Sequence, residues 1–440
     1  MRRPAAHRRL RVLLVAMNYA PERSGTAPYT TAWAEDTARR HQVLVLAGVP
    51  HYPEWRVHEG YGAWLTQTVE NGVRVRRLRH VVPSSTAPAR RLAHESSFAA
   101  RVLSQRLPAP DVVLAVSPPL FGAAAAARLA ARFRVPFGLV VQDLYSQGVR
   151  ELGHGNGRAG DALTGLESRV VRRADAVLTI SDRFRATVTC ALGADPARVS
   201  VVGNWSHLPR ARTDRAAVRA ELGWGTEHVV LHAGNMGRKQ GLGNVVAAAR
   251  RADERGLPMR FVLLGDGNQR PTLAAAAAGV RRLDFLPPAD QDRYADLLAA
   301  ADVLLVNELP GVAEMSLPSK LTSYCAAGRP VLGAVARNGA TAAELHASGA
   351  GVVVPPGAPD ALVDGALDIV HDPVGAAVLG ERGRAHAAAH NSARPALQQY
   401  EHWLTRLAGT TRQQAPRPRT TVNTVRHSRI MSKLNVQFST

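Results

Sequence analysis

The chain has 440 residues, of which 46% are hydrophobic and 20% are charged, so it is long enough for two globular domains with full cores. Its formal net charge is +20, and eleven of these charges lie in residues 1–11 and 411–440, which contain no acidic residue. Aromatic residues make up only 5% of the chain, whereas folded nucleic-acid-binding domains usually combine clustered basic residues with exposed aromatics. The charge distribution therefore argues against a nucleic-acid-binding protein.

The two basic ends, residues 1–10 and 410–440, are expected to be solvated arms. Such arms would either have no partner or contact an anionic membrane surface. The longest apolar run near the start, residues 12–17, is too short for a signal-peptide core or a membrane span. We therefore expect a cytoplasmic protein that is free or peripheral on the inner membrane face.

Short apolar runs alternate with amphipathic or alanine-rich stretches in two successive series, which predicts parallel strands connected by helices. Strands are predicted at residues 11–17, 42–47, 73–79, 112–116, 137–142, 176–180 and 199–202, and then at 228–233, 259–264, 280–286, 303–307, 331–334 and 351–354. Helices are predicted between them, among others at residues 28–40, 123–131, 242–255, 290–300 and 319–326. The pattern indicates an α/β protein with two doubly wound, Rossmann-like domains.

The alternation pauses at the polar, proline-containing segment 203–214. We therefore predict an N-terminal domain at residues 11–205, a C-terminal domain at 206–395, and a final helix at 396–409 that packs back across both. In open α/β sheets, ligands bind outside the carboxyl ends of the strands. We expect the functional residues there, in a cleft between the two domains.

In each domain, a glycine-containing loop follows the first strand. Gly25 and Thr26 precede the first predicted helix, where glycine allows a close backbone approach and the helix start offers N–H groups to a phosphate. The second loop has the sequence GNMGRKQG, in which Gly234 and Asn235 precede two adjacent cations, Arg238 and Lys239. Such a pair beside a helix start suits a diphosphate and would stabilise negative charge on a departing nucleotide.

Further candidates follow later strands. Gly265, Asp266 and Gly267 form a predicted turn, which on its own is a weak signal because these residue types favour turns. Asp143 ends a strand of the first domain and would either orient a substrate hydroxyl or cap a helix.

The segment from Glu314 to Lys320 precedes a predicted helix whose N-cap is Ser319, so the backbone before the helix would face an anion. The side chains of Glu314 and Ser316 would hold sugar hydroxyls, and Leu317 lies in the same donor-binding stretch.

We predict no metal site. The sixteen histidines show no convincing ligand spacing, and Cys190 and Cys325 are far apart in predicted helices, which favours neither a metal centre nor a disulfide. His51 lies in the segment HYPEW just past the second strand, from where it could reach the cleft. Serine-hydrolase, zinc-protease and phosphate-loop motifs do not occur.

Taken in order, these segments resemble the family 4 retaining glycosyltransferases, which have the GT-B fold, and especially the colanic-acid-type enzymes that build cell-surface polysaccharides. The resemblance covers roughly residues 10–400 and is carried by the segments NYAPERSGTAPYT, HYPEW, VVQDLY, HAGNMGRKQGL, LLGDG, FLPPAD and LPSKLTSYCAAGRPV.

This resemblance implies that a nucleotide-diphosphate-sugar donor lies mostly against the second domain. Arg238 and Lys239 would bind its diphosphate, Gly25 would lie near the donor phosphate, residues 265–267 would approach the nucleotide, and residues 314–320 would hold the sugar and phosphate. It also implies that no metal or other cofactor is needed, and that the anomeric configuration is kept by front-face attack. The acceptor would be a saccharide, a lipid-linked molecule or a small molecule.

The chain departs from the family pattern at three positions. Many members carry two glutamates separated by seven residues in the sugar-binding loop, and here Met315 and Ser323 stand there. Many members also have a histidine at the position of Gln142. Either other groups contact the nucleotide ribose and the sugar, or the donor differs.

Two other functions remain open at this point. A sugar-nucleotide epimerase of the same fold would need several acids and histidines converging in the cleft. A non-catalytic basic binding protein would act through the arms alone.

Overall fold

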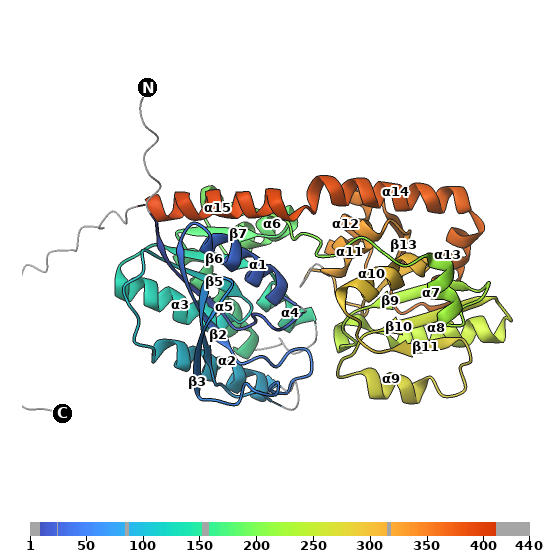
Figure 1. Cartoon of the computed structure of the whole chain (residues 1–440), viewed down its shortest axis with the longest axis horizontal. Helices are drawn as coiled ribbons and strands as arrows, with labels where there is room; N and C mark the ends of the chain where they lie inside the picture. The colour runs from blue at the N-terminus through green and yellow to red at the C-terminus, as the bar shows by residue number, and fades with distance from the viewer. Residues whose placement is uncertain (1–8, 24, 84–87, 152–157, 315–317, 411–440) are drawn as a thin grey trace, which may run out of the picture.

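The computed structural model describes residues 9–23, 25–83, 88–151, 158–314 and 318–410 and places them in two α/β lobes that lie side by side (Figure 1). The first lobe contains an eight-stranded sheet and the second a six-stranded sheet. Among the described residues, every strand pair is parallel except β3 with β4. The predicted fold class, two doubly wound domains, is confirmed.

The strands have the following spatial order. The first sheet runs β3 (Leu65–Glu70), β4 (Val73–Leu78), β2 (Gln42–Gly48), β1 (Arg11–Ala16), β5 (Val112–Ser117), β6 (Phe137–Val141), β7 (Ala176–Thr179) and β8 (Val199–Val201). The second runs β11 (Leu283–Leu286), β10 (Met259–Leu264), β9 (His228–Ala233), β12 (Val303–Asn307), β13 (Val331–Ala334) and β14 (Gly351–Val354).

Helices connect the strands. In the first lobe they are α1 (Ala27–Ala38), α2 (Pro88–Leu103), α3 (Leu120–Phe133), α4 (Tyr145–Glu151), α5 (Arg158–Arg173) and α6 (Asp182–Cys190). In the second they are α7 (Arg215–Glu221), α8 (Gly243–Glu254), α9 (Arg270–Ala276), α10 (Gln291–Ala300), α11 (Lys320–Ala327), α12 (Ala340–Ser348) and α13 (Pro359–His371), followed by α14 (Pro373–His390) and α15 (Ala393–Gly409).

Two strands differ from the prediction. The strand expected at residues 280–286 begins only at Leu283, because Val280 closes a turn onto Ala277 and the backbone of Arg281 donates to Asp253. Strand β3 was not predicted, since its residues are mostly polar and exposed. It pairs antiparallel with β4 through a turn in which Asn71 and Gly72 both have positive φ.

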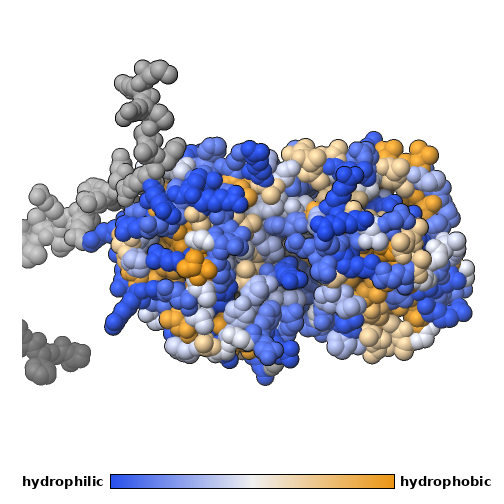
Figure 2. All heavy atoms as spheres, viewed as in Figure 1, coloured by the Kyte–Doolittle hydropathy of each residue, from blue (hydrophilic) through white to orange (hydrophobic). Residues whose placement is uncertain are grey.

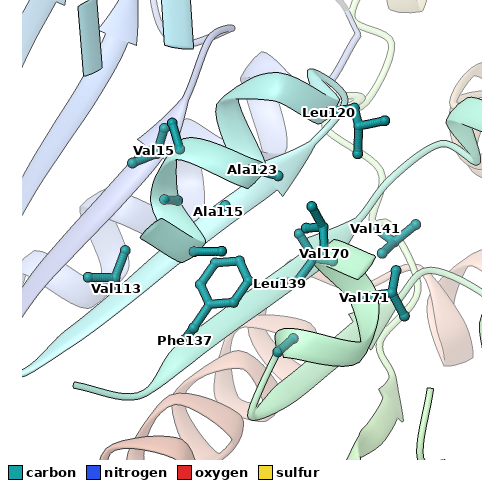
Figure 3. Close-up of a cluster of buried hydrophobic side chains, with 14 of the residues drawn as sticks. Val15, Val113, Ala115, Leu120, Ala123, Phe137, Leu139, Val141, Val170 and Val171 are labelled. Atoms are coloured by element: carbon teal, nitrogen blue, oxygen red, sulfur yellow. The ribbon is translucent and has the colours of Figure 1, made fainter. Parts of the chain in front are cut away.

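The alternating faces of the buried strands form two hydrophobic layers on each sheet, as expected for parallel strands covered on both sides. On one face of the first sheet, Val113 and Leu139 pack with Ala123 of α3 and Val170 of α5 (Figure 3). On the other face, Leu14 belongs to a cluster with residues of α1 and α15. Two corresponding clusters enclose the second sheet.

The last two helices join the lobes. Helix α14 packs against α11 of the second lobe, and α15 packs against the first lobe, with Trp403 and Leu407 buried there. In Figure 1 the two helices follow one another along one edge of both lobes. Where the chain returns, Asn391 accepts from the backbone of Ser206 and donates to the carbonyl of Asn204, so the two crossings between lobes lie together.

No helix in the described part of the chain combines the length and the apolar character needed to cross a membrane. On the face shown in Figure 2, hydrophilic residues predominate and hydrophobic residues form small, separate groups.

Candidate active site

Residues at the carboxyl ends of the two sheets contact one another across the lobes. The amide nitrogen of Asn235, after β9, lies 3.1 Å from the hydroxyl of Tyr52, which follows β2. Arg183, at the start of α6, forms an ion pair with Glu314 of the second lobe. Two of the predicted site residues, Asn235 and Glu314, therefore lie at a junction between the lobes, where the carboxyl ends of the strands meet.

The loop after β9 is shaped by glycines. The backbone of Met236 donates to the carbonyl of Asp266 at 2.7 Å, so the turn of Gly265, Asp266 and Gly267 supports this loop. A Cβ on Gly265 would lie 2.2 Å from the carbonyl oxygen of Gly234, and one on Gly267 would lie 2.6 Å from the side-chain oxygen of Asn235. Only glycine permits this close packing, which explains both residues without requiring contact with a ligand.

Lys320 begins α11 and lies beside the same loop. Its ammonium nitrogen is 3.0 Å from Nε2 of His232, and a Cβ on Gly234 would lie 3.5 Å from its Cε. Burial, together with repulsion from Lys239, lowers the pKa of Lys320 to about 7, although Glu308 acts in the opposite direction. Two cations that repel each other in a partly buried place favour an anion between them.

Lys239 lies in a short 3-10 turn, Arg238–Gln240. Its positive charge acts on Asp143 of the first lobe. Burial raises the pKa of Asp143, and the positive charges of Lys239 and Arg91 oppose that rise. The two residues predicted to act from opposite domains, Asp143 and Lys239, are thus brought together.

Arg238, although adjacent in sequence, has different surroundings. Its side chain is exposed and lines a cavity of about 420 Å³ formed by the N-terminal ends of α8, α9 and α13, which does not include Lys239. The two adjacent cations therefore differ in their surroundings, and the charge of Lys239 acts on Lys320.

The predicted donor-binding residues between Glu314 and Ser319 differ in their surroundings. Glu314 accepts from Nε of Arg183 at 2.6 and 2.7 Å, so its carboxylate already has a partner in the other lobe. Ser319 is the N-cap of α11 but makes no capping hydrogen bond with its side chain. Ser316 and Leu317 lie outside the described residues.

The loop of the first domain lies against the junction. Gly25 has φ of +65°, and a Cβ there would lie 3.4 Å from the ring of Tyr52. Thr26 is the N-cap of α1, again without a side-chain capping bond. From the first turn of α1, Tyr29 meets α11, where Ser319 and Thr322 oppose the rise of its pKa that burial causes.

Two of the three residues that differ from the family pattern contact other side chains in the structure. Gln142 is buried, and its side-chain oxygen accepts from Asn204 at 2.9 Å. Ser323 interacts with the hydroxyl of Tyr294, whose pKa burial raises. Met315 lies outside the described residues.

Three histidines that are scattered in sequence, His51, His80 and His94, come together in the first lobe, each less than 7% exposed. Burial lowers the pKa of His80 to about 3 and that of His94 to about 4, so both rings are neutral at pH 7. Sequence spacing missed this group. One feature of the sequence could have indicated it: His51 and His80 follow the carboxyl ends of strands β2 and β4, and these two strands pair directly.

Sequence comparison identifies relatives over most of the chain. Residues 24–205 match the family described as Glycosyl transferase 4-like domain, and residues 227–372 match Glycosyl transferases group 1. The colanic acid biosynthesis glycosyl transferase WcaI of Escherichia coli strain K12 is 33% identical over 333 residues, which span 72% of this chain and 82% of that protein. The D-inositol 3-phosphate glycosyltransferase of Rhodococcus erythropolis is 30% identical over 190 residues, or 40% of this chain and 43% of the relative.

Solved structures agree with the fold. HepE of Anabaena, crystallised with UDP-glucose, superposes with a TM-score of 0.68 at 17% identity, covering 90% of this chain and 100% of HepE. Sucrose-phosphate synthase of Thermosynechococcus elongatus gives a TM-score of 0.69 at 17% identity, covering 90% of this chain and 99% of that enzyme. The chain therefore belongs to the glycosyltransferase 4-like family and is a glycosyltransferase of the GT-B fold.

Proposed function

We propose that this chain is a retaining glycosyltransferase that takes a sugar from a nucleotide-diphosphate-sugar donor and needs no metal ion at the diphosphate. The observation that carries the proposal is the placement of Lys239 and Lys320, on separate loops of the second lobe, close enough that the charge of one lowers the pKa of the other. The full sequence contains only three lysines among 55 basic residues, and two of them meet at this junction.

A diphosphate would relieve this repulsion. Its negative charge would favour the ammonium form of Lys320, and the backbone N–H groups at the start of α11 would add donors. Two lysines and a helix start supply the positive charge that a divalent cation provides in other phosphate sites. The named ligand of HepE, UDP-glucose, supports a nucleotide-sugar donor.

In the proposed reaction, the bond between the anomeric carbon and the diphosphate oxygen breaks while the acceptor oxygen forms a bond to the same face of that carbon. The acceptor proton passes to the departing diphosphate. Lys239 and Lys320 stabilise the charge that develops on the leaving group. Asp143, near Lys239, positions a hydroxyl of the donor or the acceptor.

We assign the acceptor to the saccharides, lipid-linked or free, because the relative WcaI is named for colanic acid biosynthesis. We place the enzyme in the cytoplasm, with its basic arms in contact with the anionic inner face of the membrane. Nearly all of both arms lies outside the described residues. Removal of residues 1–10 together with 411–440 should abolish sedimentation with anionic vesicles and leave donor turnover unchanged. Vesicle binding that survives this double deletion would contradict a membrane contact through the arms.

The test of the proposed function begins with a thermal-shift screen of UDP-, GDP- and dTDP-sugars, because a ligand that binds the folded state raises its apparent stability. With the donor that raises the melting temperature of the protein, turnover should require an acceptor. Added Mg²⁺ or Mn²⁺ should not increase this turnover. Nuclear magnetic resonance of the product should show the anomeric configuration of the donor.

Each alternative function predicts a different outcome. Conversion of the donor to an epimer without any acceptor would identify an epimerase, and the absence of any donor-induced shift would favour a basic binding protein. An inverted anomeric centre would contradict the retaining mechanism while leaving the transferase assignment intact.

A further inference from the structure

The three histidines of the first lobe form a compact cluster beside the candidate active site. One ring nitrogen from each of His51, His80 and His94 lies within 4.8 Å of those of the other two. The ring centroids are 5.2 Å apart for His51 and His80 and 4.9 Å apart for each of the other two pairs. Within the described residues, no other group of three potential ligands is arranged in this way.

Backbone carbonyls fix the orientation of all three rings. Nδ1 of His51 lies 2.8 Å from the carbonyl oxygen of Val49, and Nδ1 of His80 lies 3.1 Å from that of Leu78. Nδ1 of His94 lies 2.6 Å from the carbonyl oxygen of Val81. Because a carbonyl only accepts, each Nδ1 carries the proton and each Nε2 presents a lone pair.

At least one of these lone pairs has no partner among the described residues. Nε2 of His80 is buried and has no hydrogen-bond partner within the part of the chain that the structure describes. A buried polar atom without a partner is costly, so its presence needs an explanation. Gly48 makes room for this ring, since a Cβ there would lie 2.7 Å from Cε1 of His80.

The carboxylate of Glu22 is already hydrogen-bonded, so Glu22 is not a free fourth ligand for the cluster. One of its oxygens accepts from the backbone N–H groups of His51 and Tyr52 at 2.8 and 2.9 Å, and the other accepts from Asn18 at 2.8 Å. Glu22 therefore holds the loop that carries His51 in place.

We propose that His51, His80 and His94 bind one divalent transition-metal ion, Zn²⁺ in the first instance, through their Nε2 atoms. Neutral imidazole is a preferred ligand of such ions, and a hydrogen bond from Nδ1 to a backbone carbonyl is the usual support for it. Tetrahedral coordination with Zn–N bonds of about 2.0–2.1 Å would draw the three ring nitrogens closer together than they now lie. A water molecule would supply the fourth ligand.

The ion would join three separate segments: the loop after β2, the loop after β4, and α2. The loop after β2 also carries Tyr52, which contacts Asn235 of the second lobe. The metal would therefore stabilise the first-lobe wall of the junction, and neither Lys239 nor Lys320 is among its ligands. The proposal does not depend on the identity of the donor.

The test uses the full-length protein, treated with a chelator and titrated with Co²⁺ and then with Zn²⁺. One Co²⁺ per chain should bind, with the visible absorption bands of a tetrahedral site, and Zn²⁺ should displace it and raise the melting temperature. His80→Gln and, separately, His94→Gln should weaken binding by at least about 100-fold, because each removes one of three ligands.

The matched control is the double substitution His386→Gln with His390→Gln. These two histidines lie one turn apart on α14, with ring centroids 4.7 Å apart, and would account for weak surface binding of a metal. The control should retain the Co²⁺ spectrum and its affinity. Absence of binding to the parent protein would overturn the proposal, as would a Co²⁺ spectrum that survives in folded His80→Gln or disappears in the α14 double variant.

Discussion

The ammonium nitrogen of Lys320 lies 3.0 Å from Nε2 of His232, a residue of β9. The same lysine lies beside Gly234, in the loop that follows this strand. Burial lowers the pKa of His232 well below its ordinary value, so its ring is neutral and accepts a hydrogen bond from the lysine. Burial also brings the pKa of Lys320 down to about 7. The charge of this lysine therefore changes within the physiological pH range.

Donor affinity should depend on pH through Lys320. A bound diphosphate raises the pKa of the lysine, so binding above pH 7 requires uptake of a proton, whereas below pH 7 the lysine is already charged in both states. The dissociation constant should be flat below pH 7 and rise by up to about tenfold per pH unit above it. Calorimetry at pH 8 in buffers of different ionisation enthalpy should detect the proton uptake.

Lys320→Met provides the control for this pH dependence. The variant should bind the donor more weakly at every pH and lose the proton uptake. A wild-type affinity that stays constant from pH 6 to pH 9 would show that Lys320 does not contact the donor.

The same lysine affects the stability of the unliganded protein in the opposite direction. Its pKa in the folded state, about 7, is below the ordinary value of 10.5, so the unfolded chain binds more protons between these values. Through this group alone, the free energy of unfolding should rise with pH in that window. Urea titrations of the wild type and Lys320→Met at pH 7 and pH 9 should show a smaller increase in the variant.

Lys239→Ala should reduce turnover by about 2–4 kcal/mol of barrier, or about 30- to 1,000-fold, the range for loss of a preorganised charge at a developing anion. Arg238→Ala should have a smaller effect, because Arg238 is exposed and lines a separate cavity. Steady-state kinetics of both single variants and the double variant check this. Parental turnover in the purified double variant would refute the assignment of these cations.

Most of the fold could be predicted because its strands are buried on both faces and therefore appear as continuous apolar runs. Strand β9 coincides with the predicted residues 228–233, and β12 with 303–307. Strand β3 was missed because an exposed edge strand lacks that signal. The Asn71–Gly72 pair that turns it back onto β4 is, however, a recognised hairpin sequence.

The candidate site was harder to derive because it depends on residues that meet only in space. Position after a strand made Asp143 and Lys239 candidates, and the resemblance to the family added Lys320. Neither argument showed that Arg238 and Lys239 have different surroundings, since the direction of a side chain in a 3-10 turn depends on the packing of that turn. Contacts between lobes, such as Arg183 with Glu314, have no local sequence signal at all.

Substitution of Glu314 should separate its two potential roles. If Glu314 holds the donor sugar, Glu314→Gln should weaken donor binding, whereas Arg183→Gln should leave it unchanged or strengthen it by freeing the carboxylate. Neither change should alter the free energy of unfolding by more than about 1 kcal/mol, because both side chains are partly exposed. Equal loss of donor affinity in both variants would instead show that the ion pair matters for bringing the lobes together.

The C-terminal helix should be an integral part of the first lobe. Trp403 of α15 is 2% exposed, and Gly138 of β6 allows its close approach, since a Cβ there would lie 2.6 Å from the indole ring. Trp403→Ala should lower the free energy of unfolding by about 3–5 kcal/mol, as expected for removal of a large buried aromatic side chain. The neighbouring exposed residue provides the control, since His402→Ala should change stability by less than about 0.5 kcal/mol. Urea denaturation followed by tryptophan-independent circular dichroism measures both, and equal stability of the two variants would mean that α15 is dispensable for the first lobe.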